Sequence, residues 1–101
     1  MNIIELAKVI RSKNSGPFKI TLDVIFKDEK KYNYVKNANV ITPELIAKLY
    51  QISKDDIIAF TWYEQGRALK VTIPRTIPSG SPGDTDVYGC QQHAPMLNIN
   101  I

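Results

Sequence analysis

Residues 19–27 alternate apolar and other side chains more regularly than any other stretch of the chain. Ile20, Leu22, Val24 and Phe26 occupy every second position, so an extended backbone places them on one face. A period of two matches a strand and not a helix, whose period is 3.6. This segment therefore predicts a half-buried β-strand, around which the other elements can be placed.

The segment before this strand is ambiguous. Residues 4–12 mix β-branched and polar side chains and could form a strand or a helix. We predict a strand, because Asn14, Gly16 and Pro17 end the segment and a clearer strand follows. The two strands would then form an antiparallel pair.

Two helices are predicted after this pair. Asp28 is a suitable N-cap for a short helix that ends near residue 37. Thr42-Pro43-Glu44 places a capping hydroxyl, a proline and an acidic side chain at the start of a second helix, which ends near residue 51. Residues 53–56 add one more capped turn. The apolar side chains expected to face the core are Tyr32, Val35, Leu45, Ile46, Leu49 and Tyr50.

Two more strands are predicted at residues 57–64 and 68–73, joined by a hairpin turn in which Gly66 is free to take a positive φ. Residues 97–101 alternate again and predict a short edge strand. Strands thus come in runs before and after the helices, which predicts an α+β fold with helices on one face of a mostly antiparallel sheet. The inward-facing side chains of the two later strands would be Ile58, Phe60, Trp62, Leu69, Val71 and Ile73.

Length and composition fit a single domain, with 101 residues of which 44% are hydrophobic and 23% charged. We divide it into a core of residues 1–75 and a tail of residues 76–101 that packs on the same domain. No apolar run is long enough to span a membrane, no signal peptide is evident, and one cysteine cannot form an internal disulfide, so a cytoplasmic location is expected. The net charge of +3 is not clustered with aromatic residues, which argues against nucleic acid as a partner.

The first candidate site is the stretch of residues 11–18. Two cations, two hydroxyls and a glycine at a turn could bind a carboxylate or a phosphate. The alternative is an ordinary hairpin loop with solvated cations. Asp23 would either face water, which we favour because it shares a strand face with Thr21, or pair with Arg11 or Lys13. The candidate ligand-binding residues here are Arg11, Ser12, Lys13, Asn14, Gly16 and Asp23.

The second candidate site is residues 74–95, which hold four of the six prolines and three of the five glycines among varied polar side chains. Loops of this length in small domains are functional or disordered. Asp84, Asp86 and His93 could serve as acid–base residues or metal ligands, but with one histidine we expect neither a bound metal nor a cofactor. Cys90 fits a small buried residue better than a nucleophile. The alternative is a loop locked by side chain-to-backbone hydrogen bonds. The remaining candidate ligand-binding residues are Arg75, Ser79, Gly80, Gly83, Tyr88, Gln91 and Gln92.

Both candidate sites carry a family resemblance. Residues 7–18, 21–26, 83–89 and 91–95, with Arg11-Ser12-Lys13-Asn14-Ser15-Gly16-Pro17 as the first motif, resemble the small AtuA-like proteins, long catalogued as a domain of unknown function. The resemblance implies a ferredoxin-like fold. It also implies kinship with the C-terminal domain of the larger acyclic terpene utilisation protein AtuA, as if a fused protein had been split into two chains. It implies no particular reaction.

The leading hypothesis is an accessory subunit of a large AtuA-like chain that is not catalytic on its own. It would bind an anionic metabolite, such as an acyl-CoA or a carboxylate, or complete the partner's site. Arg11 and Lys13 would bind the anion, Asp23 would orient these cations, and residues 80–93 would complete the pocket or the interface.

Two alternatives belong to other functional classes. One is a small homo-oligomeric enzyme that uses Asp84, Asp86 and His93. The other is an oligomerisation module in which the tail swaps onto a neighbouring copy and residues 97–101 add a strand to its sheet.

Overall fold

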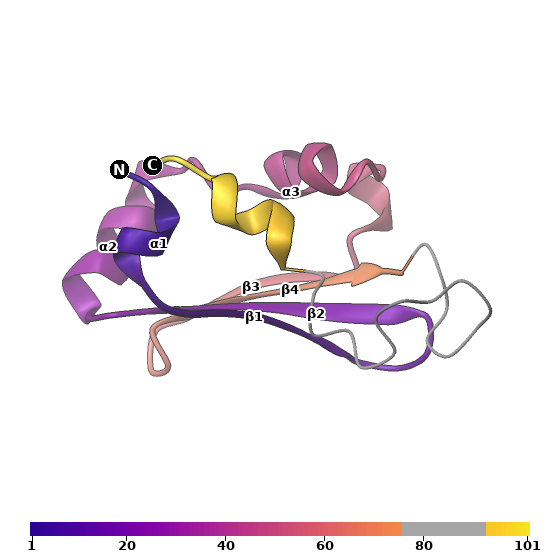
Figure 1. Ribbon diagram of the computed structural model, residues 1–101, viewed down its shortest axis with the longest axis horizontal. Helices are drawn as coiled ribbons and strands as arrows, with labels where there is room; N and C mark the ends of the chain where they lie inside the picture. The colour runs from indigo at the N-terminus through magenta and orange to yellow at the C-terminus, as the bar shows by residue number, and fades with distance from the viewer. Residues whose placement is uncertain (76–92) are drawn as a thin grey trace.

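The computed structural model describes residues 1–75 and 93–101, and Figure 1 shows a two-layer fold. One layer is an antiparallel sheet with the strand order β1-β2-β4-β3. The other layer holds the helices, all on one side of the sheet (Figure 1). The strands are β1 (Ala7–Asn14), β2 (Lys19–Phe26), β3 (Ala59–Tyr63) and β4 (Ala68–Pro74). The α-helices are α1 (Ile3–Leu6), α2 (Glu29–Ala38) and α3 (Pro43–Tyr50), and the 3-10 helices are η1 (Lys54–Asp56) and η2 (Ala94–Asn98).

This arrangement confirms the predicted α+β class and the antiparallel sheet with helices on one face. The two layers are compatible with the ferredoxin-like sandwich that the resemblance implies, and that finer classification stays a prediction.

Strand β2 lies inside the sheet, paired with β1 on one side and β4 on the other. Its alternating apolar side chains face the helices and are at most 2% exposed, as the period of two predicts. Phe26 stacks on Trp62 of β3 with ring centroids 6.4 Å apart and meets Tyr32 of α2 edge to face at 6.0 Å. Aromatic contacts between the sheet and α2 therefore fix one end of the core.

The helices begin at the predicted caps. The Asp28 carboxylate accepts the backbone N–H of Lys31 at 2.8 Å, and the Thr42 hydroxyl accepts that of Leu45 at 3.2 Å. The hydrogen bond from the Lys31 backbone, and then that from its ammonium, hold the pKa of Asp28 below its usual value. The predicted inward positions Tyr32, Val35 and Ile46 are buried, and Leu45, Leu49 and Tyr50 are half-buried against the core.

The predicted strand at residues 4–12 is wrong at its start. Asn2 and Glu5 form a reciprocal capping box, in which Asn2 Oδ1 accepts the N–H of Ile4 at 2.8 Å and Glu5 Oε2 accepts the N–H of Asn2 at 3.2 Å. This box stabilises the single turn α1, which buries Ile3 and Leu6, three residues apart. The strand begins only at Ala7 and continues to Asn14, so the turn before β2 is shorter than predicted.

The predicted edge strand at residues 97–101 is also wrong. Residues 94–98 form η2 instead, and the buried side chains are Met96 and Ile99, again three residues apart. Only Asn100 makes a β-bridge, to Asn2, and the N–H of Ile3 donates to the carbonyl of Ile99 at 2.9 Å. One β-bridge and the backbone hydrogen bonds to residues 1–3 therefore hold this end of the chain, and no strand forms.

One smaller prediction at β3 is wrong, and the hairpin after this strand uses a different residue from the one expected. Ile58 precedes the strand and is 51% exposed, whereas Phe60 and Trp62 pack on the core as predicted. In the hairpin that follows, the left-handed residue is Arg67 (φ 48°) and not Gly66. The N–H of Arg67 donates to the carbonyl of Glu64 at 3.2 Å and closes the turn of residues 64–67, whose last residue, and not its glycine, takes the positive φ.

Candidate functional site

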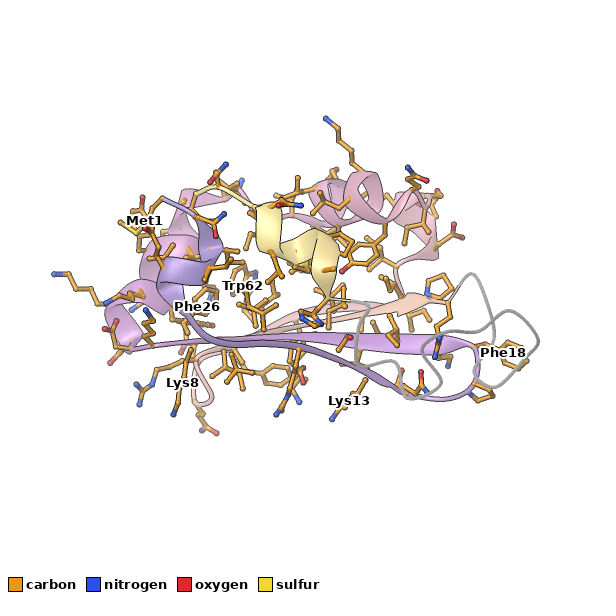
Figure 2. The ribbon with its side chains drawn as sticks, in the orientation of Figure 1. Met1, Lys8, Lys13, Phe18, Phe26 and Trp62 are labelled. Atoms are coloured by element: carbon orange, nitrogen blue, oxygen red, sulfur yellow. The ribbon has the colours of Figure 1, made fainter. Side chains whose placement is uncertain are left out.

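The face of the sheet opposite the helices, here called the open face, carries the charged part of the first candidate site. Strand pairing places residues in rows across this face, and the central row is Arg11, Asp23, Lys70 and Thr61. Lys8 and Lys13 of β1 project away from the helix layer, below the sheet in Figure 2. The open face comprises Lys8, Val9, Arg11, Lys13, Lys19, Thr21, Asp23, Ile25, Ala59, Thr61, Tyr63, Ala68, Lys70, Thr72 and Pro74.

Asp23 is buried, which corrects our expectation that it faces water. Its residue exposure is 1%, and its Oδ2 accepts a hydrogen bond from Arg11 Nε at 3.1 Å. The Arg11 side chain is 54% exposed. Burial of a carboxylate is costly unless it has a hydrogen-bonded partner, so the guanidinium stabilises it and is in turn held in one position. The structure therefore shows the alternative that we did not favour, in which Asp23 pairs with Arg11.

Lys70 was missed by the sequence reasoning. It lies opposite Asp23 on β4, and its ammonium sits 5.7 Å from the centroid of the Tyr63 ring. Asp23 Oδ1 is buried and has no hydrogen-bond partner among residues 1–75 and 93–101. The alternation of β4 could have placed Lys70 on this face, but the strand order that brings it beside Asp23 is not readable from the sequence.

The strands concentrate positive charge. They contain five cations, Lys8, Arg11, Lys13, Lys19 and Lys70, and Asp23 is their single carboxylate. Every other described carboxylate lies in a helix, a turn or a loop. Because the strands carry few carboxylates to compensate their cations, the open face presents an electropositive surface.

The other strand residues of the first candidate site, Ser12 and Asn14, lie on the opposite face of the sheet from Arg11 and Lys13. Ser12 is buried on the helix side of β1, since it pairs with Leu22. Asn14 lies on the same side and accepts a hydrogen bond from Arg75 Nη1, and the Arg75 N–H donates to the Phe18 carbonyl at 2.9 Å. The structure thus brings together Asn14 and Arg75, one residue from each candidate site. Their hydrogen bond connects the end of β4 to the end of β1 and has a structural role.

Gly16 serves the geometry of that turn. Its φ of 135° is a conformation that L side chains rarely adopt. The N–H of Ser15 donates to the Lys19 carbonyl at 3.1 Å, and the N–H of Lys19 to the Gly16 carbonyl at 3.5 Å. The turn therefore follows the ordinary hairpin alternative, and the cations that could bind an anion lie on the strand before it.

His93 is the one member of the predicted acid–base set that the structure describes. It precedes η2, and its Nδ1 is buried without a hydrogen-bond partner in the described part of the chain. The described residues contain no cluster of three or more histidine, cysteine or acidic side chains that could hold a metal ion. The remaining candidates lie outside the described residues: Ser79, Gly80, Gly83, Asp84, Asp86, Tyr88, Cys90, Gln91 and Gln92.

Comparison with known proteins places the chain in a family without assigning it an activity. Neither the curated proteins nor the solved structures gave a match. Among the described residues, no helix has the length and apolar character needed to cross a membrane. One family model, described as a domain of unknown function (DUF4387), matches residues 3–100, nearly the entire chain. The chain therefore belongs to the DUF4387 family.

Proposed function

We propose that the open face binds the anionic group of a metabolite, a carboxylate or a phosphate such as those of an acyl-CoA. The observation that carries this proposal is the Arg11–Asp23 pair, in which a half-exposed guanidinium is fixed by a carboxylate that is 1% exposed. A fixed guanidinium loses less conformational entropy when it binds an anion than a mobile one.

The geometry leaves Arg11 able to donate further. A guanidinium has five N–H donors, and Asp23 occupies the one on Nε. The two Nη groups form the planar fork that matches a carboxylate or a phosphate. Lys13, two residues along the same face of β1, and Lys70, in the row of Arg11 but two strands away, would add positive charge nearby.

We further propose that the protein is a cytoplasmic accessory subunit of a larger AtuA-like chain. The resemblance of residues 7–18, 21–26, 83–89 and 91–95 to the small AtuA-like proteins is what supports this role. The described residues offer a binding face rather than a nucleophile paired with a base. The subunit would then contribute ligand contacts to a site that the large chain completes.

Anion binding can be tested with coenzyme A as the probe, titrated at low ionic strength into ¹⁵N-labelled protein and followed by NMR. We expect saturable shifts on β1, β2 and β4. Lys13→Gln and Lys70→Gln should each weaken binding by about three- to tenfold, because each removes one charge-assisted contact. Raised salt should weaken binding in all forms.

Lys48→Gln is the matched control, since Lys48 is an exposed lysine of α3 in the helix layer. It should bind coenzyme A as the unmodified chain does. Shifts confined to the helix layer, or an equal loss of affinity in Lys48→Gln, would contradict the assignment of the open face.

The subunit role predicts a stable partner. Tagged protein purified from its own host should recover a large chain at close to one-to-one stoichiometry, and mass spectrometry should identify that chain as AtuA-like. Recovery of the small chain alone, at a defined oligomeric mass, would refute the subunit role and favour the stand-alone alternatives.

A further inference from the structure

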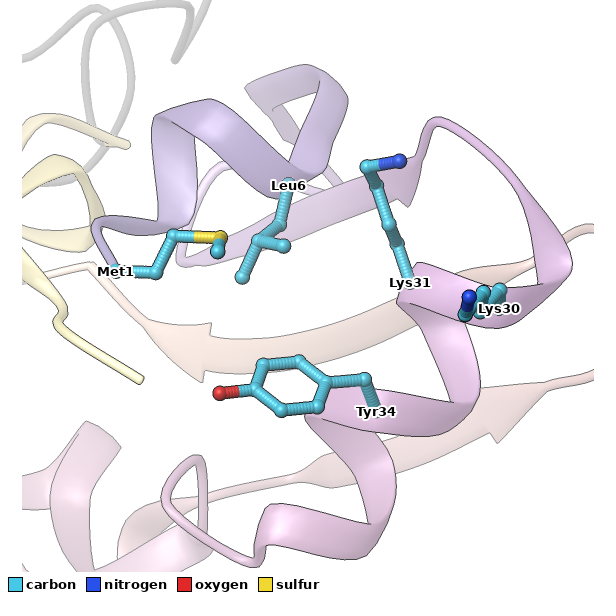
Figure 3. A pocket seen from close by; sticks show the side chains of 5 residues that line it. All are labelled: Met1, Leu6, Lys30, Lys31 and Tyr34. Atoms are coloured by element: carbon cyan, nitrogen blue, oxygen red, sulfur yellow. The ribbon is translucent and has the colours of Figure 1, made fainter.

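A hollow lies in the helix layer, between α1 and the first turns of α2 (Figure 3). Its volume is about 280 Å³, and it is lined by Met1, Leu6, Lys30, Lys31 and Tyr34. The sheet separates it from the open face, because the helices all lie on the other side (Figure 1). It is therefore a site distinct from the one proposed above.

The walls of this hollow are apolar. Leu6 forms part of the core, whereas Met1 and Tyr34 are 63% and 49% exposed. Tyr34 lies on the same face of α2 as Lys30 and Lys31, one turn further along the helix. Figure 3 shows the side chains of Met1, Leu6 and Tyr34 around one opening. Large apolar side chains that surround an open hollow, rather than pack against each other, provide a contact surface for an apolar ligand.

The two lysines differ in their charge balance. Lys31 Nζ lies 3.0 Å from Asp28 Oδ2, so its charge is matched by the carboxylate that caps α2. Lys30 has no carboxylate within 4.0 Å among the described residues. An uncompensated ammonium thus stands at the rim of an apolar hollow.

We propose that this hollow binds an amphiphilic carboxylate, namely a short- or medium-chain fatty acid. Its alkyl chain would lie against Met1, Leu6 and Tyr34, which removes apolar surface from water on both sides. Its carboxylate would pair with the Lys30 ammonium at the rim. The small volume limits the ligand to one short chain, and the open rim keeps the binding weak and reversible.

The probes are sodium octanoate, below its micelle-forming concentration, and 1-octanol, which has the same chain length without the charge. Each is titrated into the ¹⁵N-labelled full chain. We expect saturable NMR shifts at Leu6 and along residues 30–34, with octanoate binding several-fold more tightly than octanol. Lys30→Gln should weaken octanoate by about three- to tenfold and leave octanol unchanged. Tyr34→Ala should weaken both probes, because it removes an apolar wall.

Lys48→Gln is again the control and should leave both affinities unchanged. Octanoate could also bind to the open face, so its titration is repeated with the double variant Lys13→Gln/Lys70→Gln. Binding at the hollow should persist in this variant. Coenzyme A binding should be unaffected by Lys30→Gln, which separates this proposal from the proposed function. The absence of saturable shifts around the hollow, equal affinity for octanol and octanoate, or octanoate shifts confined to the strands would each overturn it.

Discussion

Arg11→Met is expected to lower the free energy of unfolding by about 2–3 kcal/mol, since it leaves the buried Asp23 carboxylate without its partner. Asp23→Leu should cost much less, because the Arg11 side chain is 54% exposed and water can solvate the guanidinium that remains. The double variant Arg11→Met/Asp23→Leu should recover most of the stability lost in Arg11→Met, as apolar replacements of ion pairs often do. Urea unfolding followed by the fluorescence of Trp62, the only tryptophan, measures all three.

Lys13→Met is the control for this cycle. Lys13 lies on the same face of β1, is exposed, and forms no ion pair with any described residue, so its replacement should change stability by less than about 0.5 kcal/mol. Equal losses in Arg11→Met and Asp23→Leu would mean that the pair behaves as a surface salt bridge. In that case the fixed guanidinium on which the proposed function rests would lose its support.

Met96→Ala is expected to cost about 2–5 kcal/mol, because Met96 is fully buried and its truncation leaves a cavity in the core. Met96→Leu keeps the volume and should cost less than about 1.5 kcal/mol. Removal of residues 93–101 deletes Ile99 as well, together with the backbone bonds from this segment to Ile3 and Met1. Two buried side chains are a large share of the stability of a domain this small, so the shortened chain should be unfolded.

Circular dichroism and size-exclusion chromatography of the shortened chain check this expectation. Leu97→Ala is a useful comparison, since Leu97 is adjacent but only half-buried. A folded, soluble monomer would show that residues 93–101 are dispensable to their own core. That outcome would favour the alternative in which the tail swaps onto a neighbouring copy.

The sequence predicts those elements that depend on local signals. The alternation of β2 and the caps at Asp28 and Thr42 are each contained within a few residues, and the structure confirms them. The capping box of Asn2 and Glu5 was also local, but the β-branched residues beside it favoured a strand by propensity. At residues 97–101 the period of two does place Ile99 and Ile101 on the core, yet residues 94–98 form η2 and only Asn100 makes a β-bridge, so no strand forms.

The candidate site was predictable only in part for a different reason. The sequence identifies Arg11, Lys13 and Asp23 as candidates and allows the Arg11–Asp23 pair. It does not reveal that Asp23 is buried, because that depends on neighbours from both adjacent strands, among them Lys70. Sheet order and register are properties of the assembled chain, so a contact across three strands cannot be derived from any one segment.

The uneven distribution of charge between the two layers also has a kinetic consequence. A surface with five strand cations and one carboxylate sets up a field that extends about one Debye length, roughly 8–10 Å at moderate salt. An anionic ligand or an acidic partner would be drawn toward the sheet and turned to face it while still separated by water. The association rate constant for binding through the open face should therefore be high at low ionic strength and fall as ionic strength rises. The dissociation rate constant should change far less.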